Sequence, residues 1–125
     1  MIAVDTNVMI YYLSGKLSKE VSYLEDLFNN SLAIFPPLVI TELLSDPWIS
    51  KKNIDFLSKA PKLDLLPGYL ERAGRLRAIL LRRGLKARTA DSLIAQSCID
   101  SRVSLLTNDK DFRNFEKYCG LDLVG

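Results

Sequence analysis

Histidine is absent from the 125-residue chain, and only two cysteines are present. Without histidine, the protein cannot use a His general base or a Ser–His or Cys–His nucleophile, which excludes much of hydrolytic chemistry. Cys98 and Cys119 belong to no CxxC or Cys/His pattern, so a structural zinc site is not expected. We expect two free thiols in a reducing compartment.

Long apolar runs and targeting segments are missing as well. No stretch approaches the roughly 20 apolar residues that a membrane span requires, and no basic, then apolar leader precedes the strand-like start MIAVD. A Gly-rich phosphate loop is also absent, which weakens the alternative of a phosphohydrolase for small phosphate esters. We expect a cytoplasmic protein without membrane contact and a single domain, residues 1–125.

Short apolar segments alternate with amphipathic segments along the chain. Strands are predicted at residues 2–4, 32–35, 62–67, 103–107 and 121–124, and helices at 8–13, 18–30, 38–45, 48–60, 70–83 and 89–101. This alternation favours an α/β fold, a three-layer α/β/α sandwich around a parallel sheet of about five strands.

Two aspartates stand where predicted strands end. Asp5 follows the first strand, and Asp109 follows the strand at 103–107. If these strands are neighbours, both carboxylates lie at one sheet edge, where open α/β sheets bind ligands. Taken alone, each has a simpler interpretation, Asp5 as a helix N-cap and Asp109 as a turn residue.

Three further acids extend this set, each with an alternative. Glu42 interrupts the apolar segment LVITELL, although it also fits the exposed face of that helix. Asp91 lies in a first helical turn, where the helix dipole favours it, yet it shares a face with Ile94. Asp111 either supports a metal or acts as a turn residue or cap.

Several carboxylates at one sheet edge repel one another unless cations neutralise them. Ligands that are all carboxylates, without His or Cys, favour hard ions, Mg²⁺ or Mn²⁺. Such ions activate water and stabilise a leaving oxygen at phosphorus. Phosphodiester hydrolysis is therefore the reaction that needs this cluster and needs no histidine.

The segments MIAVDTNVMIYYL, ITELL, ARTADSLIAQSCIDSRVSLLTNDKDFRNF and GLDLVG resemble the PIN-domain nucleases, and the short form is similar to VapC-type toxins of toxin–antitoxin pairs. The resemblance covers residues 2–124 and implies a Rossmann-like domain acting as an Mg²⁺- or Mn²⁺-dependent endoribonuclease. By position it implies an acidic catalytic set, a metal-ligand set drawn largely from the same residues, and two residues that order the site. The implied catalytic residues are Asp5, Glu42, Asp91 and Asp109. The implied metal ligands are Asp5, Asp91, Asp109 and Asp111. The implied site-ordering residues are Asn7 and Thr107.

The resemblance also implies a homodimer and a small antitoxin that covers the acidic groove. Two alternatives remain open: an RNA-processing nuclease outside a toxin–antitoxin pair, and an inactive nucleic-acid-binding module.

A basic strip runs from Arg72 to Ala90, with seven Lys or Arg residues and no acid, although the net charge is only +2. A solvated helix face explains most of it. Cations near the acidic centre are nevertheless needed to hold an RNA backbone. The members that flank the turn before Asp91 are the predicted RNA contacts: Arg82, Arg83, Lys86 and Arg88.

Overall fold

The computed structural model describes all residues, 1–125, and centres on a small parallel sheet. Strand β1 (Ile2–Val4) lies between β2 (Ala33–Ile34) and β3 (Ser104–Leu106). Ile2 pairs with Ala33 and Ser104, and Val4 pairs with Leu106. The parallel α/β class predicted from the sequence is confirmed.

The two outer strands expected from the sequence shrink to single bridges. Phe35 pairs in parallel with Lys62, and Leu105 pairs in parallel with Leu123. Leu63 is buried next to the first bridge, but Asp64, Leu65 and Leu66 are exposed, so this segment has no second buried position to extend the pairing. The sheet thus has three strands with one bridged segment at each edge, rather than five full strands.

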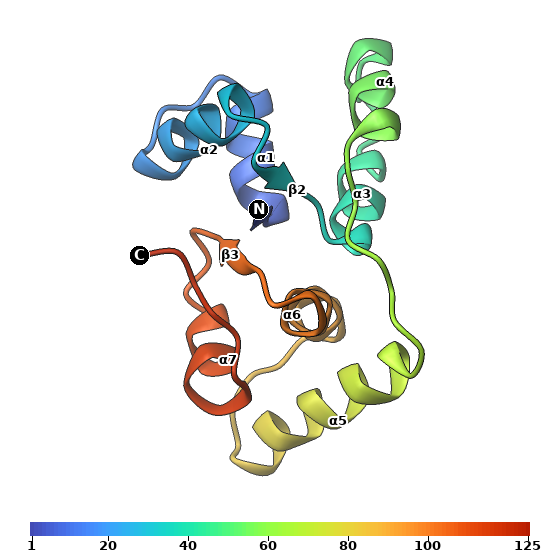
Figure 1. Ribbon diagram of the computed structural model, residues 1–125, viewed down its shortest axis with the longest axis vertical. Coiled ribbons are helices and arrows are strands. Elements are labelled where there is room, and N and C mark those ends of the chain that lie inside the picture. The colour runs from blue at the N-terminus through green and yellow to red at the C-terminus, as the bar shows by residue number, and fades with distance from the viewer.

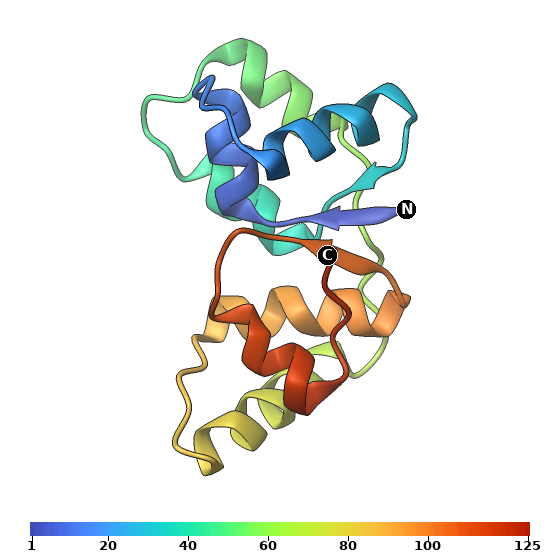
Figure 2. The ribbon, with the colours of Figure 1, turned by 90° about the vertical axis from the view of Figure 1, so that its left-hand side faces the viewer.

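Helices cover both faces of the sheet, as Figures 1 and 2 show. One layer contains α1 (Thr6–Leu13), α2 (Lys19–Asn29), α3 (Pro37–Leu44) and α4 (Lys51–Lys59). The other contains α5 (Tyr69–Arg82), α6 (Thr89–Ser101) and α7 (Phe112–Cys119). The expected three-layer α/β/α sandwich is therefore present.

Local chemistry sets the ends of several helices. Ser18 caps α2, and Pro37 opens α3, where its missing N–H has no helical partner to lose. Gly84 follows α5 with a φ of +73°, a conformation that favours glycine. Helix α4 begins at Lys51 and not at residue 48, because Asp46 accepts a hydrogen bond from the Trp48 N–H in a turn and Ser50 provides the cap.

Helix α7 is the element that the sequence reading missed. Its apolar residues are few, but Phe112 and Phe115 are fully buried and anchor it, and Gly120 ends it at a φ of +83°. Asp111 occupies the position directly before the helix, as expected for a cap residue. Its side chain makes no capping hydrogen bond.

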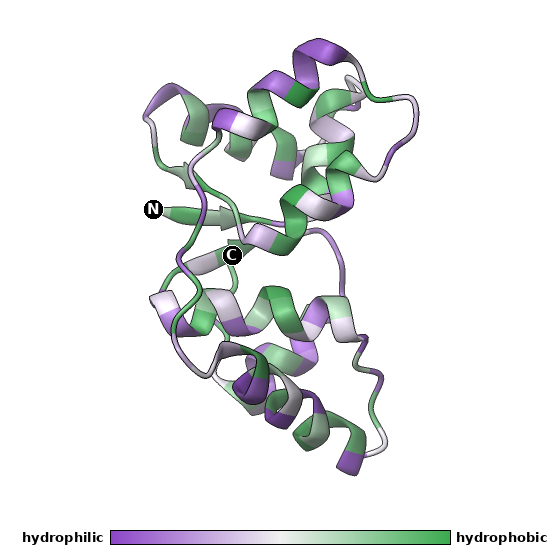
Figure 3. Cartoon of the chain, turned by 90° about the vertical axis from the view of Figure 1, so that its right-hand side faces the viewer, coloured by the Kyte–Doolittle hydropathy of each residue, from purple (hydrophilic) through white to green (hydrophobic).

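Buried hydrophobic residues from both layers form one core around the sheet. In Figure 3 the short strands are coloured as hydrophobic, while hydrophilic segments gather on the outer helices α4 and α5. Both cysteines are free, Cys98 in the core and Cys119 partly buried. Every helix is too short or too polar to cross a bilayer.

Candidate metal centre

The centre lies at the carboxyl ends of β1 and β3. Asp5 directly follows β1, and its backbone N–H donates a 3.0 Å hydrogen bond to the Leu106 carbonyl on β3. Asp109 lies just beyond β3. Because β1 and β3 are adjacent and parallel, the two aspartates meet at one edge, the arrangement expected from the sequence.

Asp5 is 3% exposed and accepts two hydrogen bonds. The Thr6 backbone N–H donates to Oδ1 at 2.8 Å, and the Thr107 hydroxyl donates to Oδ2 at 2.7 Å. The pKa of Asp5 is raised from 3.8 to about 6, mainly by burial and in smaller part by the charges of Asp91 and Asp109, while the two hydrogen bonds oppose the rise. A cation close to this buried carboxylate strongly stabilises its charged form.

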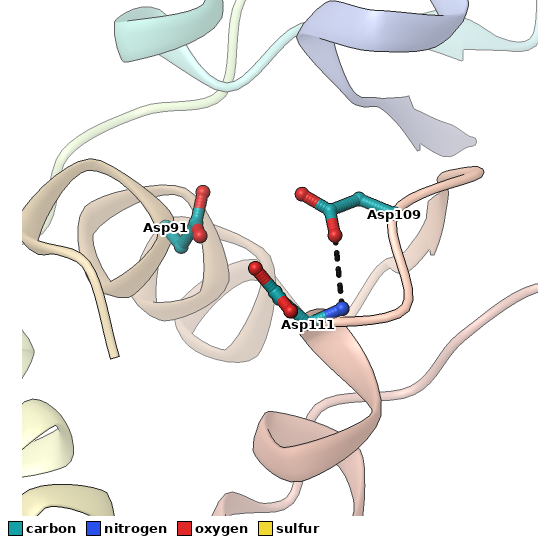
Figure 4. Close-up of side chains that lie close together, drawn as sticks. All are labelled: Asp91, Asp109 and Asp111. Carbon is teal, nitrogen blue, oxygen red and sulfur yellow. Dashed lines mark hydrogen bonds between the residues drawn. The ribbon is translucent and has the colours of Figure 1, made fainter. Parts of the chain in front are cut away.

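Thr107 connects Asp5 to the loop that carries the other acids. Its hydroxyl oxygen accepts a 3.0 Å hydrogen bond from the Asp109 backbone N–H while the hydroxyl donates to Asp5. The Asp109 Oδ1 in turn accepts from the Asp111 backbone N–H at 2.9 Å, the dashed line in Figure 4. One hydroxyl therefore sets the position of two carboxylates from different strands.

Glu42 reaches the centre through a residue that the sequence reading did not single out. Its side chain is on α3 and largely exposed, and Oε1 accepts a 2.7 Å hydrogen bond from the Thr6 hydroxyl. Thr6 is a buried polar residue directly after Asp5, so its position beside the strand end was the available signal. Asn7 is exposed and its side chain makes no hydrogen bond, and its ordering role stays a prediction.

Three aspartates from two separate elements come together in Figure 4. Carboxylate oxygens of Asp91, Asp109 and Asp111 lie within 4.8 Å of one another. Asp91 is in the first turn of α6. The pKa of Asp91 is raised to about 6, mainly by burial. The Arg88 charge opposes the rise, and the charges of Asp109, Asp111 and Glu42 contribute to it.

Two cations of the basic strip belong to this cluster. Asp111 Oδ2 lies 3.1 Å from Lys86 Nζ and 3.2 Å from an Arg88 guanidinium nitrogen, and hydrogen bonds from both hold its pKa below the ordinary value. Arg88 Nε also lies 3.6 Å from Asp91 Oδ2. Both basic side chains are therefore engaged with the acids.

The other two predicted RNA contacts are placed differently. Arg82 and Arg83 are exposed at the end of α5, and the Arg83 guanidinium lies 4.0 Å from the centre of the Tyr118 ring. The structure thus divides the four basic residues into one pair at the acids and one pair outside them. Their contact with RNA stays a prediction.

The donor set suits a hard divalent cation. The clustered ligand side chains are all carboxylates, three of them lie within reach of one ion, and the buried Asp5 adds negative charge beside them. Mg²⁺ and Mn²⁺ prefer such oxygen ligands. The residues present therefore fit a metal of this class.

Comparison with known proteins identifies the family. The sequence model of the PIN domain matches residues 2–118, nearly the whole chain. This chain belongs to the PIN domain family. No curated protein matches it in sequence. The resemblance noted in the sequence is therefore confirmed at the level of the family.

Solved structures agree with this PIN fold. VapBC2 from Rickettsia felis, bound to a DNA fragment from its promoter, is similar at 26% identity with a TM-score of 0.73, over 99% of this chain and 98% of that chain. DNA-bound VapBC from Salmonella typhimurium matches at 22% identity and a TM-score of 0.71, covering 99% of this chain and 98% of that one. FitAcB from Neisseria gonorrhoeae matches at 17% identity and a TM-score of 0.72, covering 100% of this chain and 97% of that one. The last two likenesses concern the fold alone.

Replacing Asp5 by asparagine is predicted to stabilise the protein at pH 7 in the absence of divalent ions. Because the folded-state pKa is raised to about 6, the folded protein binds a proton that the unfolded chain has lost between roughly pH 4 and 6. The free energy of unfolding of the parent therefore falls as pH rises through this range. Asp5→Asn removes that loss, about 3 kcal/mol at pH 7 for a pKa raised from 3.8 to about 6.

Urea unfolding at several pH values in EDTA measures this effect. Asp26→Asn is the control, since Asp26 is exposed on α2 and its side chain makes no hydrogen bond or ion pair. Equal pH profiles for the parent and Asp5→Asn would contradict the prediction.

Proposed function

We propose that this PIN domain is an Mg²⁺- or Mn²⁺-dependent endoribonuclease and the toxin of a VapBC-type pair. PIN domains are nucleases, so hydrolysis of nucleic acid is the general function of the chain. The observation that carries the finer proposal is the convergence of Asp91, Asp109 and Asp111 beside the buried Asp5 at the sheet edge.

Asp5, Asp91, Asp109 and Asp111 are the proposed metal ligands, and Glu42 completes the catalytic acids. A bound divalent ion supplies positive charge at the scissile phosphate and lowers the pKa of an attacking water. Fixed ligands make this chemistry efficient, because the acids need no rearrangement when substrate arrives.

The chain's own hydrogen bonds supply that rigidity. The Thr107 hydroxyl holds the Asp5 carboxylate, and the Thr6 hydroxyl holds Glu42, so two threonines orient acids from β1 and α3. Lys86 and Arg88 reduce the negative charge that an incoming phosphodiester meets at Asp111 and Asp91. Arg82 and Arg83 extend the proposed RNA contacts along the end of α5.

A small antitoxin, a homodimeric state and a cytoplasmic location complete the proposal. The antitoxin part is supported by the similarity to VapBC and FitAB proteins over 94% or more of their chains. The exposed Glu42 and the partly exposed Asp111 leave the acidic groove open to a covering partner.

Asp5→Asn is expected to lower RNA cleavage at least about 100-fold. Loss of a residue that supports a metal ligand typically lowers activity about 10- to 100-fold, and loss of a ligand should cost at least the upper value. Purified protein is assayed on a long single-stranded RNA with Mn²⁺, with Asp26→Asn as the control. Calorimetric titration with Mn²⁺ gives a second measurement, in which Asp5→Asn binds more weakly. An Asp5→Asn variant that cuts RNA like the parent would disprove the assignment, and metal-indifferent RNA binding without cleavage would favour an inactive binding module.

Thr107→Val is expected to reduce Mn²⁺ affinity about 10- to 100-fold, because the Asp5 carboxylate and the Asp109 loop lose their shared hydroxyl. Thr107→Ser keeps the hydroxyl and should retain affinity within a few fold of the parent. If both variants weaken Mn²⁺ binding equally, the hydroxyl is not the orienting group.

Co-expression with the small reading frame next to this gene tests the partner. We expect the encoded protein to co-purify with the chain and to suppress RNA cleavage, and light scattering of the chain alone to give twice its 14.1 kDa mass. A neighbouring product that neither binds nor inhibits would remove the toxin–antitoxin part of the proposal and leave the nuclease part standing.

A further inference from the structure

We propose that single-stranded RNA reaches the metal centre along a groove between α2 and α7, where Lys110, Arg113 and Lys117 bind its phosphates. The proposal rests on the nuclease function above and names where the substrate strand lies. These cations are outside the basic strip identified in the sequence.

The groove borders the centre at the loop after β3, where Asp109 is the one acid of the centre that lines it. It has a volume of about 1120 Å³ and is lined by α2, the loop after β3, α7 and the last residues of the chain. Thr107, Asn108 and Asp109 belong to its wall, so one of the proposed metal ligands faces it. Figure 1 shows α2 and α7 on the same side of the molecule with the C-terminus between them, and Figure 2 views this side directly.

Three cations line the groove on and just before α7. Arg113 and Lys117 are four residues apart on α7, the spacing that aligns side chains along a helix, and Lys110 lies in the turn before it. Lys19 faces them from α2. Glu20, Asp109 and Glu116 also line the groove, so four cationic side chains stand against three acidic ones.

The groove cations form no ion pair, and Lys117 Nζ lies 5.3 Å from the centre of the Tyr118 ring. Ion pairs in the structure involve only Arg72, Lys86 and Arg88 among the basic residues. Lys86 and Arg88 are closest to the acids but are already paired with Asp111 and Asp91. Four cations without ion-pair partners line the same groove as Asp109 and therefore provide the phosphate-binding charge that the acidic centre itself lacks.

An aromatic side chain adds a base-binding surface. Tyr23 of α2 lines the groove and is 42% exposed. Grooves that hold single-stranded nucleic acid combine cations along the backbone with aromatic rings on which bases stack. A single strand fits this combination, because its bases are free to stack while a duplex keeps them paired.

RNA binding in EDTA tests the groove separately from cleavage. The probe is a fluorescein-labelled 12-nucleotide single-stranded RNA, and binding is measured by anisotropy at several salt concentrations. Arg113→Gln/Lys117→Gln should weaken binding about tenfold and lower the salt slope by about 1.4, since each phosphate contact with a single strand contributes roughly 0.7. The matched control is Lys51→Gln/Lys52→Gln, which removes two exposed charges from α4 and should stay within twofold.

Tyr23→Ala should weaken binding about fivefold or more, whereas Tyr23→Phe, which keeps the ring, should bind like the parent. Circular dichroism and thermal melting verify that each variant is folded. The groove is disproved if Arg113→Gln/Lys117→Gln binds like the parent, if the α4 control loses as much affinity, or if the parent does not bind the probe.

Cleavage of the same RNA with Mn²⁺ separates the two proposals. If the parent binds through Arg113 and Lys117 but does not cut, the nuclease proposal fails and the groove stands. If the parent cuts while the groove variant binds and cuts equally well, the groove fails and the nuclease proposal stands.

Discussion

The hydrogen bond from the Thr107 hydroxyl to Asp5 joins residues 102 positions apart and fixes the relation between the two central strands at their functional ends. Its geometry depends on the register of β1 against β3, because the Asp5 backbone N–H must also reach the Leu106 carbonyl. The same hydroxyl accepts from the Asp109 backbone and so positions the loop that holds two more acids. The centre therefore depends on this one contact between strand ends.

Electrostatic repulsion is the cost of this arrangement. Burial, together with the charges of neighbouring carboxylates, raises the pKa of Asp5 and of Asp91 to about 6. Lys86 and Arg88 offset part of the repulsion from the turn between α5 and α6. This turn is held in place by Arg77, whose Nε donates a 2.7 Å hydrogen bond to the Ala87 carbonyl. A helix-side residue thus supports the cations that let the acids stay close together.

The basic residues near the centre fall into two groups, those paired with its acids and those without an acidic partner. Lys86 and Arg88 form ion pairs with carboxylates of the centre, whereas the groove between α2 and α7 contains cations without ion-pair partners. In the proposed path, an RNA strand that follows this positive charge approaches Asp109 from α7. The basic strip drew attention in the sequence because it was continuous, but continuity along the chain does not measure which charges remain unpaired in the fold.

The sequence by itself determined the alternation of strands and helices and the placement of Asp5 and Asp109 at strand ends, because these follow from local periodicity and short-range order. It missed α7, whose few apolar residues become a helix face only through the burial of Phe112 and Phe115 in the core. It also missed Thr6, whose hydroxyl finds Glu42 only once α3 packs beside α1. The pairing of Lys86 and Arg88 with Asp111 was likewise decided by tertiary structure. Contacts between residues far apart in the chain depend on how the layers pack. Local sequence patterns do not show which of these residues come close together in space.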